Sequence, residues 1–417
     1  MSSFFFVAFA ASSLAATCIV YRPPTKQATL ALAGFIIGIL TGELALFVIA
    51  LQMLIALLFI SCGAAQGTIG VLALAALFLS WLALAANAIM AMRSANRMQQ
   101  ALDDAGIDPL APIDHPELWQ RLRRPFSIRL PNVQCQTDII YSEGQQLGLD
   151  LYRNRDTVAG AGAPVLLYFH GGGLLEQGGT RRGQGLPLLN ELASHGWVCL
   201  SIDYRLSPSH TWPAHLVDCK SALAWLREHI AEFGGDPGFV VVAGDSAGGQ
   251  LAALMALTAN EAEFQPGFES VDTRVNAAIC NYGVMDFCNL FGSAFNAATG
   301  DIWARQVIKA ELDDPAAASL FASASAIAWA EKRAAVAPDM LLIHGDKDSL
   351  VGVQESELLA QKLRQDSENK VIFAPIDGAQ HAFNVFRSLR GELALRQTLR
   401  FARHCHRHYT AHNASSR

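Results

Sequence analysis

A serine that follows an apolar run is the first residue of this chain with the surroundings of a nucleophile. Ser246 lies in GDSAG (residues 244–248), after the strand-like run Phe239–Ala243 and before the helical pattern Gln250–Ala259. G-x-S-x-G between a strand and a helix predicts a tight turn that presents the serine hydroxyl at the edge of a sheet. Because ordinary loops of small residues share this pattern, it indicates a nucleophile only if a base and an oxyanion site accompany it.

Consecutive glycines after another apolar run could supply the oxyanion site. The segment HGGG (residues 170–173) directly follows the predicted strand Pro164–Phe169. Glycines at such a place expose backbone N–H groups with no side chain in front of them, which suits the negative oxygen formed when a hydroxyl attacks an ester carbonyl. A phosphate cradle is the alternative, but neither GK[ST] nor G-x-G-x-x-G follows, so the sequence disfavours nucleotide binding.

Two later segments could supply the base and the acid that orients it. The chain order for an elbow serine is Ser, then an acid, then His. The predicted strand Met340–His344 leads to Asp346 and Asp348, and the predicted strand Lys370–Ala374 leads to His381. We predict His381 as general base and Asp348 as the acid, because Asp346 lies nearer the strand end and suits a turn. The alternatives are solvated turn carboxylates and a histidine near a helix start.

Short apolar runs alternate with helical patterns from about residue 126 onward. Strands are predicted at Phe126–Leu130, Leu147–Tyr152, Pro164–Phe169, Trp197–Asp203, Phe239–Ala243, Val275–Asn281, Met340–His344 and Lys370–Ala374. Helices are predicted at Leu186–His195, Pro213–Phe233, Ala247–Ala259, Val353–Gln365 and Leu389–Tyr409. This alternation predicts an α/β domain with a mostly parallel sheet, helices on both faces and an antiparallel edge made by the first two strands. Residues 284–335 lack strand signals, so we expect a helical cap insertion at the sheet edge where ligands bind.

Five motifs together resemble the hormone-sensitive-lipase-like branch of the α/β-hydrolase esterases. They are HGGG at 170–173, DYRLSP at 203–208, GDSAGG at 244–249, GDKDSLV at 345–351 and GAQHAF at 378–383. They occur in the family's order, and the resemblance covers roughly residues 131–388. It implies an α/β-hydrolase fold, with Ser246 as nucleophile, Asp348 as acid and His381 as base.

The resemblance also implies roles for the backbone around the serine. It gives the N–H groups of Gly172, Gly173 and Ala247 as oxyanion donors, with His170 and DYR (residues 203–205) as structural supports. Many members of the family carry a soluble N-terminal helical cap, whereas this chain has apolar blocks in its place. The lid and the acyl pocket therefore do not carry over, and the chain looks like bacterial membrane-anchored esterases.

The first 92 residues are far more apolar than the rest. The whole chain of 417 residues is 16% charged, yet this segment has three charged side chains, Arg22, Lys26 and Glu43. Its apolar blocks are Phe4–Tyr21, Ala28–Ile60 and Thr68–Met92. A spanning helix needs roughly 20 apolar residues, so the first and third blocks fit one crossing each. The middle block is long for one helix and short for two, and Glu43 within it is either functional or packed between helices.

Basic residues decide the expected topology of this transmembrane region. Positive loops prefer the cytoplasm, and basic residues follow both the first and the third block: Arg22, Lys26, Arg93, Arg97, Arg121, Arg123 and Arg124. Three crossings place them on one side and four would separate them. We expect about three helices in residues 1–92, a linker at 93–125 and a catalytic domain at 126–412, which makes a multi-pass membrane protein with a cytoplasmic catalytic domain.

The net charge, the cysteines and the histidines of the chain bear on whether it binds nucleic acid or metal. The net charge is −6 with no dense basic patch, so a nucleic-acid partner is disfavoured. The eight cysteines form no CxxC pair, so we expect reduced thiols and no zinc site. Near the C-terminus, His404, His408 and His412 would share a helix face. They could hold a metal, but a solvated basic helix end is the simpler interpretation.

We therefore expect a serine carboxylic-ester hydrolase that works through an acyl-enzyme and requires no metal or organic cofactor. Its expected partners are a small-molecule or lipid ester and the lipid bilayer, because the apolar first quarter suggests a lipophilic substrate. Acyl transfer or amide hydrolysis by the same three residues stays open, as does a non-catalytic binding protein on this scaffold. The sequence does not fix the oligomeric state.

Overall fold

An eight-stranded sheet forms the centre of the molecule in the computed structural model, which describes residues 2–110, 115–290 and 303–415. The strands follow the order β1-β2-β4-β3-β5-β6-β7-β8. Their bounds are β1 Val133–Ser142, β2 Leu147–Asn154, β3 Ala163–Phe169, β4 Val198–Ile202, β5 Gly235–Asp245, β6 Ala277–Asn281, β7 Asp339–Gly345 and β8 Val371–Ile376. β1, β2 and β4 pair antiparallel and all later neighbours pair parallel, so the predicted α/β architecture with an antiparallel edge is confirmed.

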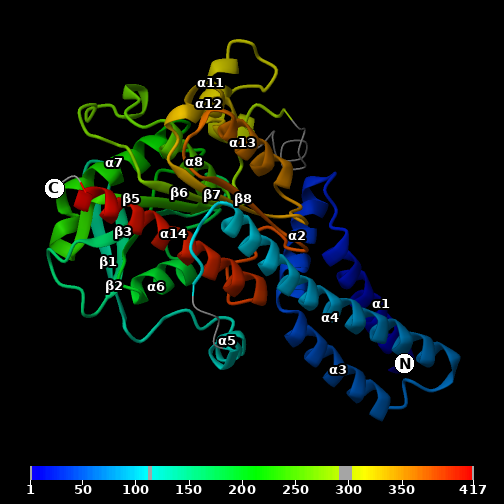
Figure 1. The fold of residues 1–417 in the computed structure, drawn as a ribbon. Coiled ribbons are helices and arrows are strands. Elements are labelled where there is room, and N and C mark those ends of the chain that lie inside the picture. Colours follow the sequence, from blue (N-terminus) through cyan, green and yellow to red (C-terminus); the bar gives the residue numbers. More distant parts are fainter. Residues whose placement is uncertain (1, 111–114, 291–302, 416–417) are drawn as a thin grey trace.

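Helices cover both faces of the sheet because the buried strands present apolar side chains on both sides. In β3, Val165 and Leu167 belong to one core cluster and Leu166 and Tyr168 to the other, as the two-residue period of a strand requires. The first cluster includes residues of α7 (Ala214–His229), α8 (Ala247–Leu257), α11 (Ala318–Ala324), α12 (Ala326–Arg333) and α13 (Val353–Asp366). The second includes residues of α6 (Leu186–Ser194), α14 (Leu389–Ser415) and the end of α4 (Figure 1).

The predicted first strand is wrong. Residues 126–130 are not in a strand, and β1 begins at Val133. Arg387 explains the difference, since its backbone N–H and its guanidinium donate to the carbonyl groups of Pro125, Ser127 and Ile128. Backbone groups bound by a side chain in this way do not join a sheet ladder.

In the region of the expected cap, the described residues contain a π-type turn at Trp303–Ile308 and the helices α11 and α12, and residues 291–302 lie outside the described part.

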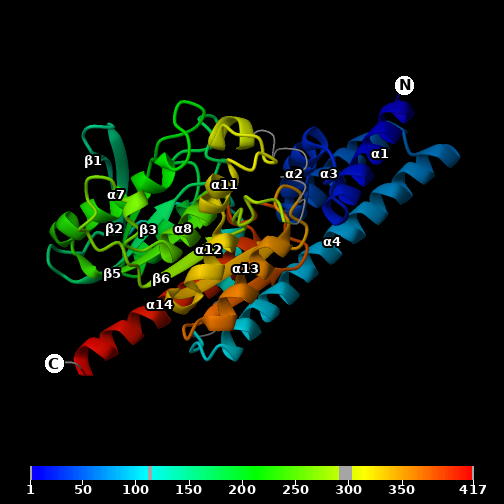
Figure 2. The same ribbon diagram turned by 90° about the horizontal axis from the view of Figure 1, so that it is seen from above.

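Four helices make up the N-terminal region: α1 Ser2–Tyr21, α2 Ala28–Glu43, α3 Ala45–Ser61 and α4 Gly67–Asp104. α1 and α4 are long and apolar enough to cross a membrane. The middle apolar block is two helices rather than one, because α2 and α3 meet at Leu44 with a bend of 87°. In Figures 1 and 2 the N-terminal helices extend from one side of the sheet domain, with α2 next to that domain.

Helix α4 does not end where the apolar residues end. It continues to Asp104, so the first part of the expected linker, residues 93–104, is helical. Ser94, Met98 and Leu102 recur at a spacing of four residues and are buried. Because Met98 and Leu102 belong to the same core cluster as β8 and α14, the second half of α4 is part of the sheet domain. Helix α5, His115–Leu122, follows within the same stretch.

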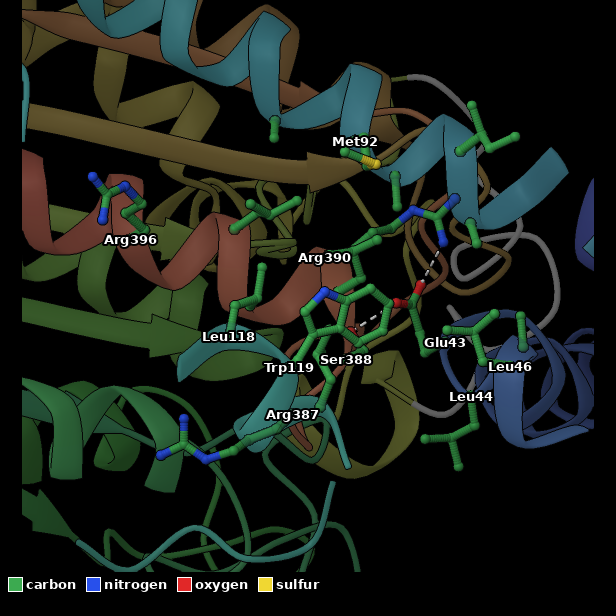
Figure 3. A pocket seen from close by; sticks show the side chains of 18 of the residues that line it. Glu43, Leu44, Leu46, Met92, Leu118, Trp119, Arg387, Ser388, Arg390 and Arg396 are labelled. Carbon is green, nitrogen blue, oxygen red and sulfur yellow. Dashed lines mark hydrogen bonds and ion pairs between the residues drawn. The ribbon is translucent and has the colours of Figure 1, made fainter. Parts of the chain in front are cut away.

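A buried ion pair joins the N-terminal helices to the sheet domain (Figure 3). Glu43, at the end of α2, lies 3.3 Å from the guanidinium of Arg390 on α14 and accepts a hydrogen bond of 2.9 Å from the Ser388 hydroxyl. Arg390 also donates to the side-chain oxygen of Asn87 on α4, at 2.8 Å. Asn87 in turn donates to the carbonyl of Gly42 at 2.9 Å. The break between α2 and α3 is therefore fixed by contacts with both α4 and α14.

Replacing only Glu43 should strongly destabilise the protein. Its side chain and that of Arg390 are each 2% exposed, so Glu43→Leu leaves a buried cation without its partner, at a cost of about 3–5 kcal/mol. The double variant Glu43→Leu/Arg390→Met should recover much of this loss, since both charges are gone. Thermal unfolding of the full chain in detergent measures both effects.

The control for this charge prediction is the pair of Arg97 on α4 with Asp377 after β8, in which the arginine side chain is 60% exposed. Arg97→Met should change the unfolding midpoint little, since exposed ion pairs contribute little. A double variant no more stable than Glu43→Leu alone would contradict the coupling of the two charges.

Candidate active site

The three side chains expected to do chemistry meet at one edge of the sheet. Ser246 follows β5, Asp348 follows β7 and His381 follows β8, and these strands are parallel, so their carboxyl ends lie on the same side. Ser246 Oγ lies 2.9 Å from His381 Nε2, and His381 Nδ1 lies 2.6 Å from Asp348 Oδ2. The structure thus brings together a hydroxyl, an imidazole and a carboxylate from residues as far as 135 positions apart.

The turn around Ser246 has the strained shape that a strand-to-helix nucleophile requires. Ser246 has φ 55° and ψ −119°, and α8 begins at the next residue, Ala247. A side chain at Gly244 would place its Cβ 2.1 Å from the carbonyl oxygen of Gly248, so the turn closes only with glycine there. As the first residue of α8, Ala247 has an N–H group with no partner inside the helix.

The environment of Asp348 keeps this buried carboxylate charged. Its Oδ1 accepts hydrogen bonds from the N–H groups of Leu350 and Val351, at 2.9 and 2.8 Å. Burial on its own would raise the pKa of Asp348, but His381 and His344 beside it hold the pKa well below the usual range. The resulting stabilisation is present above the ordinary carboxyl pKa of about 4 and is lost as the pH falls below it.

The other acid, Asp346, has the turn role that its position suggested. Its Oδ1 accepts a hydrogen bond of 2.5 Å from the N–H of Gly378, and its Oδ2 lies 3.2 Å from the Lys347 ammonium. About a third of its side chain is exposed. Asp346 therefore ties the loop after β7 to the loop after β8, while Asp348 contacts the imidazole.

The glycine loop passes close to the serine, since a Cβ at Gly171 would lie 3.0 Å from the Cβ of Ser246. The N–H of Gly171 donates to the Gln184 side chain at 2.7 Å, whereas those of Gly172 and Gly173 have no hydrogen-bond partner within the described residues. Gly172 has φ 118°, and a Cβ there would lie 2.3 Å from the Gly178 backbone. Only glycine fits this close approach, and the loop keeps two N–H groups available for an oxyanion.

His170 and Tyr204 support the glycine loop. Their rings stack at 4.5 Å, and the Tyr204 hydroxyl donates to the His170 carbonyl at 2.6 Å. Burial lowers the pKa of His170 to about 4, so this imidazole is neutral at pH 7. The flanking Asp203 and Arg205 pair with Arg181 and Asp218. These groups hold the loop in place and do not reach the serine.

Three side chains near the imidazole were not identified from the sequence. The ring of Tyr282 stands edge-on to that of His381 at 4.7 Å. Gln380 accepts hydrogen bonds from the N–H groups of Ser349 (2.7 Å) and His381 (2.9 Å), and so joins the acid loop to the base loop. Asn384 accepts a hydrogen bond from the Tyr282 hydroxyl. Tyr282 directly follows β6 and Gln380 directly precedes His381, so position alone could have indicated both.

Helix α2 of the apolar N-terminal region also touches this site. Phe35 lies edge-on to the His381 ring, with the ring centres 5.9 Å apart. One turn earlier, the carbonyl of Ala31 accepts a hydrogen bond of 3.2 Å from the Ser349 hydroxyl. Next along the same face, a Cβ at Gly38 would lie 3.2 Å from the Gln380 amide nitrogen. Nothing in the apolar pattern of this segment indicated that one face covers the imidazole.

The C-terminal histidines do not form a metal centre in the part of the chain that the structure describes, where no group of three or more His, Cys, Asp or Glu could hold an ion. The rings of His404 and His408 lie 4.2 Å apart on α14. The eight cysteines are all free thiols.

The family model and the sequence relatives agree on one family. The BD-FAE family model matches residues 149–363. The chain is 36% identical over 400 residues to the "Probable carboxylic ester hydrolase LipM" of Mycobacterium tuberculosis, covering 91% of this chain and 88% of the relative. It is 37% identical over 317 residues to "Esterase LipQ" of the same organism, covering 72% and 73%. Among solved structures, the butyrate-bound esterase Est2 of Thermogutta terrifontis is 25% identical with a TM-score of 0.48, covering 60% of this chain and 85% of that one.

Gly244→Ala should destabilise the turn that presents Ser246. The added Cβ would lie 2.1 Å from a backbone oxygen, and overpacking of this kind typically costs about 1–3 kcal/mol or more. Thermal unfolding of purified variants measures the loss. Gly144→Ala is the matched control, because a Cβ there meets nothing within 4 Å. Equal midpoints for the two variants would contradict this explanation of the turn.

Proposed function

Since this chain belongs to the hormone-sensitive-lipase-like family of α/β-hydrolase esterases, we propose that Ser246, His381 and Asp348 are its catalytic triad. The protein is a serine carboxylic-ester hydrolase that acts on small-molecule esters. The observation that carries the assignment of residues is the chain of two short contacts, 2.9 Å from Ser246 to His381 and 2.6 Å from His381 to Asp348.

The first half of the reaction follows from the protonation state that Asp348 imposes. Asp348 stays ionised and accepts the hydrogen bond from Nδ1–H of His381, which leaves Nε2 as a proton acceptor facing the serine. Nε2 takes the proton of Ser246 as Oγ attacks the ester carbonyl. The carbonyl oxygen becomes negative and is stabilised by the N–H groups of Gly172, Gly173 and Ala247. The imidazolium then gives its proton to the departing alcohol, and an acyl-enzyme remains.

The second half repeats these steps with water. His381 removes a proton from a water molecule, whose oxygen attacks the acyl carbon. The same N–H groups stabilise the second tetrahedral intermediate, and its collapse returns the proton to Ser246 and releases the carboxylic acid. The residues involved carry out both halves without a metal or an organic cofactor.

We further propose that the membrane region supplies one wall of the substrate site. The face of α2 with Ala31, Phe35 and Gly38 lies against the loops of the triad. Its other face exposes large apolar side chains, among them Ile36 and Leu40. An apolar helix between the imidazole and the solvent or bilayer favours esters with lipophilic acyl chains.

The arrangement of the helices supports three membrane crossings by α1, α3 and α4. α1 and α4 pack together, α3 packs on α4, and α2 lies beside the sheet domain (Figures 1 and 2). α3 has 17 residues, close to the shortest length that spans a bilayer. The basic residues Arg22, Arg93 and Arg97 then lie on the same side as the catalytic domain, which favours a cytoplasmic domain.

Removing triad side chains should abolish ester hydrolysis. For serine-triad enzymes, Ser246→Ala should lower kcat on the order of 10⁶-fold and Asp348→Asn on the order of 10⁴-fold. Asp346→Asn is the matched control, because this side chain accepts a bond from Gly378 and does not contact the imidazole. The asparagine oxygen can still accept that bond, so kcat should stay close to that of the unchanged protein. Hydrolysis of a short p-nitrophenyl ester measures all three. A normal rate for Ser246→Ala would end the assignment.

Phe35→Ala should change chain-length preference more than overall activity. The ring of Phe35 contacts the His381 ring, so its loss removes apolar surface beside the acyl site, worth about 1–3 kcal/mol or roughly 10- to 200-fold. We expect kcat/KM to fall more for decanoyl than for acetyl esters. Ile36→Ala, on the exposed face of the same helix, is the control and should keep the original preference. Equal losses for both chain lengths would argue against an acyl-pocket role.

A further inference from the structure

A large groove lies apart from the triad, between the membrane helices and the catalytic domain. Its volume is about 1100 Å³, and no triad residue lines it. One wall comes from the start of α3 and the end of the apolar part of α4, including Phe47, Ile89 and Met92. The opposite wall comes from α5 and α14, including Leu118, Trp119 and Arg396 (Figure 3). The groove thus begins among the proposed crossing helices and ends at the catalytic domain.

The charged side chains of the groove are mostly positive. Five arginines and a single carboxylate, Glu43, line it. Three of the arginines are compensated: Arg390 by Glu43, Arg387 by Glu392 and Arg400 by Asp103. The compensated pairs leave the other two arginines, Arg123 and Arg396, as the source of net positive charge.

Arg396 is a partly buried arginine whose charge is not balanced by a neighbouring carboxylate among the described residues. Within residues 2–110, 115–290 and 303–415, no carboxylate or carbonyl oxygen pairs with its guanidinium, although the side chain is partly buried. Burial and the neighbouring Arg400 lower its pKa, as expected for a cation without compensation. Leu118 and Trp119 of α5 line the same wall of the groove. A cation beside an apolar wall matches the chemistry of an amphiphile with a negative head.

We propose that this groove binds one anionic phospholipid of the bilayer, with its phosphate at Arg396 and Arg123 and its acyl chains along Phe47, Ile89 and Met92. Two features favour a phospholipid over a single-chain fatty acid. The volume exceeds the roughly 300–1000 Å³ of ordinary small-molecule pockets, and the apolar wall continues into the exposed faces of α3 and α4, where Phe47, Ile89 and Met92 are accessible to lipid. The inference goes beyond the proposed hydrolysis, because binding here requires none of the triad residues.

Lipid binding to the full-length Ser246→Ala protein tests the proposal without hydrolysis of the lipid. Native mass spectrometry from dodecyl maltoside counts bound dioleoyl-phosphatidylglycerol, dioleoyl-phosphatidylcholine and oleate. We expect one phosphatidylglycerol to bind at least fivefold more tightly than phosphatidylcholine, the preference that about one basic side chain provides. Acyl-brominated phosphatidylglycerol should also quench Trp119, measured by difference from Trp119→Phe. Equal binding of the two phospholipids would overturn the proposal.

Point variants locate the bound lipid. Arg396→Gln should lower the affinity for phosphatidylglycerol about fivefold and leave phosphatidylcholine unchanged. Arg93→Gln is the matched control, because Arg93 lies exposed on α4 and does not line the groove; it should keep the preference. Ala88→Phe should fill the apolar part and remove the quenching of Trp119 without changing any charge. Equal effects of Arg93→Gln and Arg396→Gln would reduce the preference to general surface attraction and overturn the site.

Oleate separates the phospholipid from a released fatty acid as occupant. Both carry an anionic group on an apolar chain, so Arg396 alone does not distinguish them. We expect oleate to bind more weakly than phosphatidylglycerol and not to displace it at equal concentration. The proposal would be overturned in favour of a fatty-acid site if oleate displaced phosphatidylglycerol from the protein and this displacement disappeared in Arg396→Gln. These results do not depend on catalysis, so they stand or fall separately from the triad.

Discussion

The hydrogen bond between Asp348 and His381 is the interaction on which the site depends. A buried carboxylate is costly unless hydrogen-bond partners stabilise it. Asp348 has two imidazoles beside it, those of His381 and His344, and accepts hydrogen bonds from the N–H groups of the loop that follows it. The loops after β7 and β8 must therefore lie together, and Gln380 and Asp346 hold them there. The parallel order of β5 to β8 then sets the distance to Ser246.

The N-terminal helices contribute contacts to the site and are not only a separate anchor. α2 contacts the acid loop through Ala31 and the imidazole through Phe35, and its end is held by the buried pair Glu43–Arg390. An apolar helix thus lies against the imidazole, so the same contacts set the shape of the proposed substrate wall and the position of the proposed bilayer.

The sequence predicted the residues whose positions follow from local pattern. Ser246, Asp348 and His381 each come after an apolar strand, and parallel strands bring such residues to one edge, so alternation and motif order were sufficient. The break at Leu44 and the contact of Phe35 with His381 were not predicted, because an apolar run of this kind shows no periodicity that marks which face meets a distant loop. The predicted strand at residues 126–130 was wrong for a similar reason, because a contact with a distant residue decides the structure. Arg387 binds the backbone carbonyl groups of this segment, and these long-range bonds override its local strand propensity.

The uninterrupted course of α4 has a mechanical consequence. A helix of 38 residues is a rod of about 57 Å, and its two halves lie in different surroundings, one among the apolar helices and the other in the core beside β8. The catalytic domain therefore cannot swivel on a flexible tether. In the proposed bilayer, the tilt of this one helix sets the angle at which the carboxyl edge of the sheet faces the lipid, so the thickness of that bilayer would influence the orientation of the catalytic domain.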